Sequence, residues 1–187
     1  MSTPLFVSAT AEEAAHLPPD APLLVTGIGT VNCTIALCRA VEEYRPTQLI
    51  NLGTAGALRP AMAGVFVVSE VFQHDLSDEV IAEMTGRPFP NRLHLDVAGH
   101  GLPTARLATG DSFISDSVVR DQLATRADLV DMEGYAVARV ARAYDLPLTL
   151  LKQVSDNADE GAPLTWFEAV DRGARELAEA VRKLELA

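Results

Sequence analysis

The stretch Leu129-Val130-Asp131-Met132-Glu133-Gly134 joins two apolar residues to two carboxylates and a glycine. Carboxylates are poor strand formers and are costly to bury, so the stretch indicates the end of a strand. A helix with an apolar face is predicted directly after it, over residues 135–144. In open α/β sheets, ligands bind at the carboxyl ends of strands. The stretch therefore predicts an α/β fold and one part of a ligand-binding edge.

The same alternation of strand and helix extends in both directions along the chain. Apolar and β-branched runs predict strands at 4–8, 22–26, 48–52, 64–72, 105–109 and 146–154. Helices are predicted over about 31–43, from Ser115 or Asp116 to about Thr125, and from Thr165 onward. Residues 76–101 carry turn-forming residues and predict a long loop. We expect one α/β domain over residues 1–187 with a largely parallel sheet.

Composition excludes several classes of function. The net charge of −11 argues against nucleic acid or an anionic membrane as the main partner, because both require a basic face. No apolar run reaches transmembrane length, and no signal peptide is predicted at the N-terminus. Cys33 and Cys38 lie on one predicted helix and match no disulfide or zinc pattern. A cytoplasmic location is therefore the default expectation.

Three histidines fall in or near the predicted long loop, at His74, His94 and His100. Their spacing matches no known pattern of metal ligands. Solvated loop histidines are the favoured interpretation, and no metal is expected.

Five polar or glycine-rich clusters follow predicted strands. They are Glu12 and Glu13, Gly53 to Gly56, Gly110 to Ile114, Asp131 to Glu133, and Ser155 with Asp156. Each has a structural explanation of its own; Glu12 and Glu13, for example, suit the first turn of a short helix. If the strands are parallel, however, all five meet at one edge of the sheet.

Such a set of groups suits the hydrolysis of a base–ribose bond. One carboxylic acid can protonate the leaving group and another can activate water, as in glycoside cleavage. A third carboxylate can accept hydrogen bonds from two neighbouring hydroxyls. Phe113 offers an aromatic face for a flat ring. By contrast, Gly27-Ile28-Gly29 is interpreted as a tight strand-to-helix turn, because it lacks the rest of a dinucleotide-binding motif.

Four motifs resemble the nucleoside phosphorylase/nucleosidase superfamily, and in particular its nucleosidases. They are residues 51–57 (NLGTAGA), 110–114 (GDSFI), 130–134 (VDMEG) and 154–159 (VSDNAD). The resemblance implies a three-layer α/β/α sandwich around a mixed sheet. It also implies a purine nucleoside substrate with a 5′ substituent, such as methylthioadenosine or S-adenosylhomocysteine, with no cofactor and a homodimer as the usual assembly.

The resemblance also implies catalytic roles. Asp156 matches the general acid that protonates N7 of the purine, and Ser155 the residue that orients it. Glu13, or else Glu12, matches the glutamate that activates water.

Further residues match substrate-binding positions. Glu133 matches the residue that holds the ribose 2′ and 3′ hydroxyls. The others are Met132 against the sugar, Phe113 and the Ile114 backbone at the base, Thr54 near the water, Gly56 in the close-approach turn, and Lys152 where nucleosidases carry an arginine.

Three other functions stay open from the sequence. A purine nucleoside phosphorylase would need arginines for phosphate, and the acidic N-terminal turn would repel that anion. A futalosine-type nucleosidase would differ in the 5′ group, which residues 76–101 usually help to bind, partly across the dimer. The substitution of Lys152 for arginine keeps open a catalytically weak nucleoside-binding homologue, because the two side chains differ in donor geometry.

Overall fold

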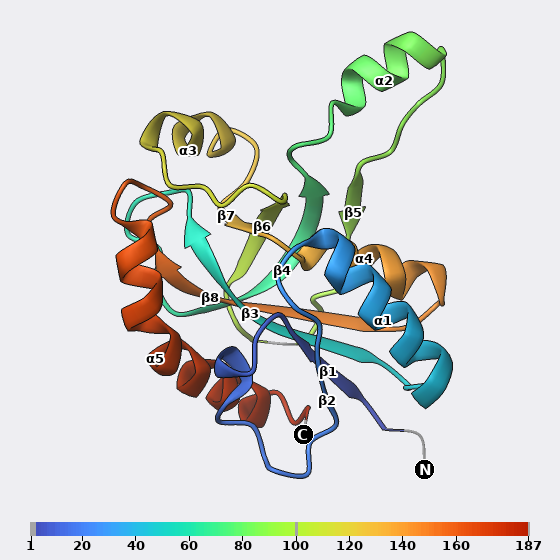
Figure 1. Ribbon diagram of the computed structural model, residues 1–187, viewed down its shortest axis with the longest axis vertical. Coiled ribbons are helices and arrows are strands. Elements are labelled where there is room, and N and C mark those ends of the chain that lie inside the picture. The colour runs from blue at the N-terminus through green and yellow to red at the C-terminus, as the bar shows by residue number, and fades with distance from the viewer. Residues whose placement is uncertain (1–2, 100, 187) are drawn as a thin grey trace.

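The computed structural model describes residues 3–99 and 101–186 (Figure 1), so His100 lies outside the described part. The strands are β1 (Leu5–Ser8), β2 (Leu23–Val25), β3 (Leu49–Ala57), β4 (Val65–Gln73), β5 (Arg92–His94), β6 (Thr104–Thr109), β7 (Leu129–Asp131) and β8 (Leu148–Asp156). The helices are α1 (Thr30–Tyr44), α2 (Asp78–Thr85), α3 (Ser117–Leu123), α4 (Gly134–Ala143) and α5 (Ala162–Lys183), with a 3-10 turn η1 (Glu12–Ala14).

The strands form one mixed sheet in the order β2-β1-β3-β7-β6-β4-β5, and β8 pairs with both β3 and β4. Strands β3, β7, β6, β4 and β8 are therefore hydrogen-bonded in a closed circuit. Within the described residues, five of the eight strand pairings are parallel, and the β3–β7, β4–β5 and β4–β8 pairings are antiparallel. The prediction of a mostly parallel mixed sheet is confirmed.

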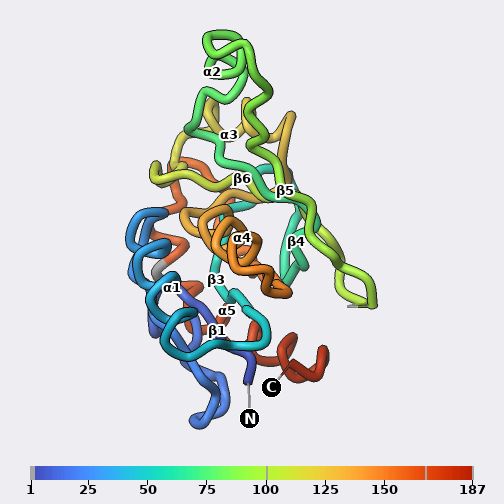
Figure 2. Tube along the Cα trace, turned by 90° about the vertical axis from the view of Figure 1, so that its right-hand side faces the viewer, coloured from blue at the N-terminus to red at the C-terminus, as the bar shows by residue number. Residues whose placement is uncertain are grey.

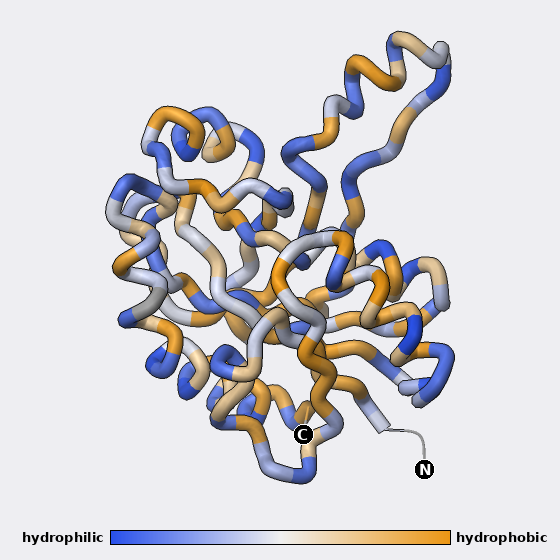
Figure 3. The backbone as a smooth tube through the Cα atoms, in the orientation of Figure 1, coloured by the Kyte–Doolittle hydropathy of each residue, from blue (hydrophilic) through white to orange (hydrophobic). Residues whose placement is uncertain are grey.

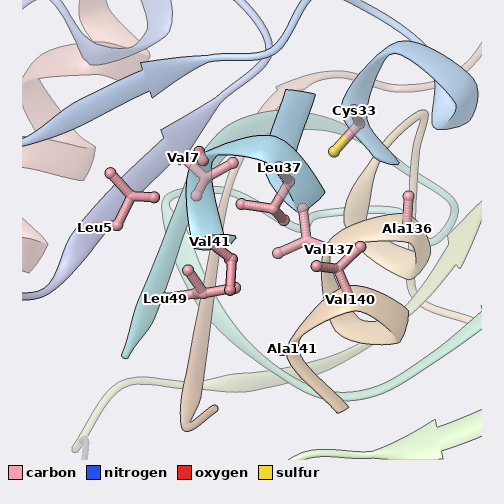
Figure 4. Close-up of a cluster of buried hydrophobic side chains, with 11 residues drawn as sticks. Leu5, Val7, Cys33, Leu37, Val41, Leu49, Ala136, Val137, Val140 and Ala141 are labelled. Atoms are coloured by element: carbon pink, nitrogen blue, oxygen red, sulfur yellow. The ribbon is translucent and has the colours of Figure 1, made fainter. Parts of the chain in front are cut away.

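Helices cover the sheet on two sides, as the three-layer prediction requires. On one side α1 and α4 pack on β1 and β3, where Leu37 and Val41 of α1 meet Val137 and Val140 of α4 (Figure 4). On the other side α5 places Leu177 and Val181 against β1, β3 and β8. Hydrophobic residues gather along the central strands and the inner faces of these helices (Figure 3). Among the described residues, no helix is long and apolar enough to cross a membrane.

Three predicted boundaries were wrong. Strand β3 does not end at Leu52 but continues through the glycine-rich run to Ala57, because β8 and β7 pair with that run on its two sides. Helix α5 begins at Ala162, with Pro163 in its first turn, where a missing N–H breaks no hydrogen bond. The predicted loop at 76–101 contains α2 and β5. Helix α2 has no buried residue and stands away from the rest of the molecule (Figures 1 and 2).

The strand ends converge, although not all strands are parallel. Gly56 of β3 pairs with Val130 of the antiparallel strand β7, and Ala57 pairs with Leu129, so the end of β3 lies beside the short strand β7. Strand β8 runs parallel to β3 and brings Asp156 opposite Gly56. Three of the predicted polar clusters therefore meet at the junction of two strand directions.

Candidate active site

A cavity of about 210 Å³ opens at this junction. Its walls include nine of the predicted site residues, which are Glu13, Thr54, Gly56, Phe113, Ile114, Met132, Glu133, Ser155 and Asp156. Two predicted residues, Glu12 and Lys152, are not on the wall. The cavity wall also contains Ile28, Val130, Asp131 and Trp166, to which the sequence assigned no role in the site.

Asp156, the last residue of β8, is buried and held by two donors. The Ser155 hydroxyl donates to its Oδ2 at 2.7 Å, and the Ala158 N–H donates to its Oδ1 at 2.8 Å. Burial raises the pKa of Asp156 above its ordinary value, although these two hydrogen bonds act in the opposite direction. Gly56 leaves the space for this carboxyl, because a Cβ there would lie 3.0 Å from Asp156 Oδ1. A carboxyl group with a raised pKa is suited to donate a proton.

Glu13, in η1, is the second buried carboxylate and is 4% exposed. Its Oε1 accepts from the Thr54 N–H and the Thr54 hydroxyl, both at 2.7 Å. Its Oε2 has longer contacts with Ser8 and Thr10, between 3.3 and 3.5 Å. Glu12 is exposed, because the turn directs adjacent residues to different sides. Of the two glutamates left open by the sequence, the structure places only Glu13 at the cavity.

Glu133 is the third carboxyl group, at the residue before α4. Its Oε1 accepts the Gly29 N–H at 2.7 Å, so the Gly27-Ile28-Gly29 turn holds this side chain. The turn joins β2 to α1, which confirms its interpretation as a strand-to-helix connection. Burial, and next the Asp131 carboxylate, raise the pKa of Glu133 to about 7, while Lys152 and the Gly29 N–H act in the opposite direction.

Lys152 lies beneath the cavity in an ion pair with Asp131. Its Nζ is 2.9 Å from Asp131 Oδ2, and both side chains are 1% exposed. Burial lowers the pKa of Lys152, but the carboxylates of Asp131, Glu133 and Glu13 outweigh burial and raise it. Lys152 was expected to contact the substrate directly. In the structure its side chain is instead buried behind Asp131 and is not on the cavity wall. Gly53 allows this, because a Cβ there would lie 2.7 Å from Nζ.

Asp131 organises the beginning of α4. Its Oδ2 accepts the Gly134 N–H at 2.8 Å and its Oδ1 accepts the Thr109 hydroxyl at 2.6 Å. Thr109 Oγ1 in turn accepts the Tyr135 N–H at 2.9 Å. The free N–H groups at the start of a helix require such acceptors, and they fix the backbone that carries Glu133.

Apolar and aromatic side chains form the rest of the wall. Phe113 and Ile114 come from the segment between β6 and α3, and Ile28 comes from the turn before α1. Trp166, the fifth residue of α5, donates its indole N–H to Thr54 Oγ1 at 2.8 Å. Sequence reasoning missed Trp166, although it is the chain's one tryptophan and lies ten residues after Asp156.

The predicted histidines lie away from this arrangement. His94 Nδ1 contacts Glu70 Oε2 at 3.4 Å, and its side chain is exposed. His74 directly follows β4 and is partly buried, so the expectation of a solvated loop histidine was wrong for this residue. Burial lowers its pKa. Among the residues that the structure describes, no group of three or more His, Cys, Asp or Glu side chains is placed to hold a metal ion.

The fold and the cavity together define an α/β protein with a concave site at the junction of its strand ends. Asp156 and Glu133, whose carboxyl groups both have raised pKa values, and the hydrogen-bonded carboxylate of Glu13 line one cavity with a largely apolar wall. The chain belongs to the phosphorylase superfamily, whose family model matches residues 21–186.

Relatives and solved structures agree with this assignment. The chain is 30% identical over 183 residues to the 5′-methylthioadenosine/S-adenosylhomocysteine nucleosidase of Geobacillus kaustophilus, covering 87% of this chain and 77% of the relative. It is 29% identical over 170 residues to the nucleosidase of that name from Shewanella sediminis, covering 80% and 74%. The Helicobacter pylori nucleosidase of this type superposes with a TM-score of 0.87 at 19% identity, covering 98% and 97%. A futalosine hydrolase mutant of Helicobacter pylori superposes with a TM-score of 0.86 at 17% identity, covering 99% of each chain.

Replacement of the buried cation should destabilise the fold. In Lys152→Met the Asp131 carboxylate would remain buried without its partner, which costs about 3–5 kcal/mol of the free energy of unfolding. Urea unfolding followed by circular dichroism measures this loss. Lys183→Met is the matched control, because Lys183 is exposed near the end of α5, and its effect should stay within about 0.5 kcal/mol. Equal stabilities for the two variants would contradict the structural role of the ion pair.

Proposed function

We propose that this protein is a purine nucleoside hydrolase that cleaves the N-glycosidic bond of a 5′-substituted adenosine of the methylthioadenosine/S-adenosylhomocysteine type. In the described part of the chain, four buried carboxyl groups line the cavity, and one of them, Asp131, is paired with Lys152. The observation that carries the proposal is the arrangement of the other three, each in a different setting: Asp156, Glu13 and Glu133. The curated relatives named above share this activity in their names.

In the proposed reaction Asp156 supplies the proton. Its raised pKa keeps the carboxyl protonated to higher pH than in a solvated aspartate, and the proton passes to N7 of the purine. The electron pair of the bond between the ribose anomeric carbon and the base then leaves with the base, so the sugar gains oxocarbenium character. Ser155 holds the Asp156 carboxyl in place before and after the transfer.

Glu13 removes the proton from the attacking water. Thr54 holds one oxygen of Glu13 with two short hydrogen bonds, which leaves the second oxygen, with its longer contacts, to accept the water proton. The water oxygen bonds to the anomeric carbon, and the products are the free base and the sugar. Glu133 binds the two ribose hydroxyls, and Met132 packs against the ring.

Water rather than phosphate fits the charge of the cavity. Within the described residues, no arginine or lysine lines the wall, and the nearby Lys152 is already paired with Asp131. A phosphate dianion beside Glu13 and Glu133 would meet repulsion without a compensating cation. This argument favours a hydrolase over the phosphorylase alternative.

The proposed assembly is a homodimer. The cavity of about 210 Å³ is below the roughly 300–1,000 Å³ of common small-molecule pockets, so a further wall from a second copy is reasonable. Next to it, Ile28, Val31 and Ile35 are each at least half exposed; Val31 and Ile35 share one face of α1, and Ile28 lies in the turn just before this helix. Such an apolar patch is typical of an interface. The proposed location is the cytoplasm, which fits the two free cysteines.

A base-release assay tests the reaction. The protein should release adenine from methylthioadenosine and S-adenosylhomocysteine at the same rate with and without phosphate. Adenosine, inosine and futalosine in the same assay define the 5′ group and the base. A strict requirement for phosphate would establish a phosphorylase, and no release from any substrate would leave only a binding protein.

Asp156→Asn should lower kcat at least about 100-fold while its circular dichroism spectrum stays that of the parent.

Substrate affinity should depend on the ionisation of Glu133. The ionised carboxylate accepts hydrogen bonds from the ribose hydroxyls, and its pKa is about 7. Affinity for adenosine should therefore weaken as the pH falls from 8 to 6, because protonation removes an acceptor. Calorimetry in the Asp156→Asn background measures this without turnover and without titration of Asp156.

Two controls isolate Glu133 in this measurement. Glu133→Gln should weaken binding about 10- to 100-fold and remove the pH dependence. A 2′,3′-dideoxynucleoside, which lacks the hydroxyls, should bind with the same affinity at each pH. A pH dependence that persists in Glu133→Gln would assign it to another group.

The homodimer has a direct test. Sedimentation velocity should give a dimer for the parent protein and a monomer for Val31→Asp, because a charge would be buried at the apolar patch. Val118→Asp is the matched control, since Val118 is an equally exposed valine on α3, at 65% against 66% for Val31. A monomeric parent at micromolar concentration would refute the proposed assembly.

A further inference from the structure

Trp166 stands at the wall of the cavity and also contacts a residue that holds Glu13. It is the fifth residue of α5, and its indole N–H donates to Thr54 Oγ1 at 2.8 Å. Thr54 belongs to β3, and Glu13 belongs to η1. Three separate elements are thus connected by one chain of hydrogen bonds.

The chemistry of the indole fixes the direction of this chain. A tryptophan N–H can only donate, whereas a threonine hydroxyl has one proton to donate and lone pairs to accept. Because Thr54 Oγ1 accepts from Trp166, its own proton is free to point to Glu13 Oε1, at 2.7 Å. Without the indole, the hydroxyl proton could rotate toward other acceptors.

The result is an unequal treatment of the two Glu13 oxygens. Oε1 receives two short hydrogen bonds from Thr54, one from the hydroxyl and one from the backbone N–H. Oε2 is held by the Ser8 hydroxyl at 3.3 Å and by Thr10 at 3.3 and 3.5 Å, which are weaker contacts. The carboxylate is therefore oriented by Oε1, and Oε2 keeps capacity for a further donor.

Trp166 also links Glu13 to the segment that carries the proton donor. Asp156 ends β8, and α5 begins six residues later at Ala162. The Ala158 N–H in this connection holds Asp156 Oδ1. The connection after β8 therefore holds Asp156, and the beginning of the helix that follows it holds Thr54, and through Thr54 Glu13, by way of Trp166.

We infer that Trp166 is a positioning residue that orients Glu13 for water activation through the Thr54 hydroxyl, in addition to forming part of the cavity wall. This inference rests on the proposed function, because it requires Glu13 to be the water activator. Trp166 acts through Thr54 and takes no proton itself.

A double-mutant cycle tests the kinetic part. Trp166→Phe keeps an aromatic side chain at the wall but removes the N–H donor together with part of the ring. Loss of this one neutral hydrogen bond should lower kcat about three- to tenfold, with KM changed less than about twofold. Thr54→Val should also lower kcat, and Trp166→Phe added to it should cause no further loss. In Thr54→Ser, which keeps the hydroxyl, Trp166→Phe should have its full effect. An effect on KM alone, or additive effects in the cycle, would overturn the inference.

The single tryptophan gives a second readout that does not depend on activity. In a ¹H–¹⁵N spectrum the Trp166 indole signal should shift upfield in Thr54→Val, because the N–H loses its acceptor. It should also move in Glu13→Gln and remain in place in the control Glu12→Gln, whose side chain is exposed. An indole chemical shift that is unchanged in Thr54→Val would overturn the inference even if the enzyme is active. If the signal moves as expected but no nucleoside is cleaved, the contact stands and both the proposed function and the catalytic role of Trp166 fall.

Discussion

The ion pair between Lys152 and Asp131 is the contact on which the site depends. A fully buried lysine is costly unless carboxylates surround it, and here Asp131 pairs with it directly while Glu133 and Glu13 stabilise its charge. Asp131 also accepts from the backbone at the start of α4. The pair therefore joins β8, β7 and α4 under the cavity, and Gly53 of β3 provides the space for the amine. The carboxylates on the cavity wall thus lie near a buried ammonium group that is not itself on the wall.

Three carboxyl groups around one cavity can perform different tasks because their surroundings differ. Asp156 is buried with few donors, and its pKa is raised. The pKa of Glu133 is raised to about 7 by burial and by Asp131, while Lys152 and the Gly29 N–H act in the opposite direction. Glu13 receives two short hydrogen bonds on one oxygen. Groups of one chemical type thus become a proton donor, a diol acceptor and a proton acceptor in the proposed reaction.

The sheet topology explains why these groups meet. A purely parallel sheet would line up all strand ends at one edge, which was the basis of the sequence argument. In the structure, β3 crosses into an antiparallel pairing with β7, and Gly56 lies beside Val130. The convergence was predicted correctly, but its cause was only partly predicted, because antiparallel pairing over two residues leaves no pattern in the sequence.

The sequence by itself determined the fold class, the order of most elements and nine residues of the cavity wall. It did so because apolar periodicity and polar clusters at strand ends are local patterns. Only the tertiary structure placed Glu13 rather than Glu12 at the cavity, since adjacent residues of one turn differ in direction rather than in type. It also showed that Lys152 is buried in an ion pair with Asp131, that Asp131 accepts from the backbone at the start of α4, and that Trp166 donates to Thr54. Each of these depends on contacts between residues far apart in the chain, and such contacts are set by packing rather than by local sequence.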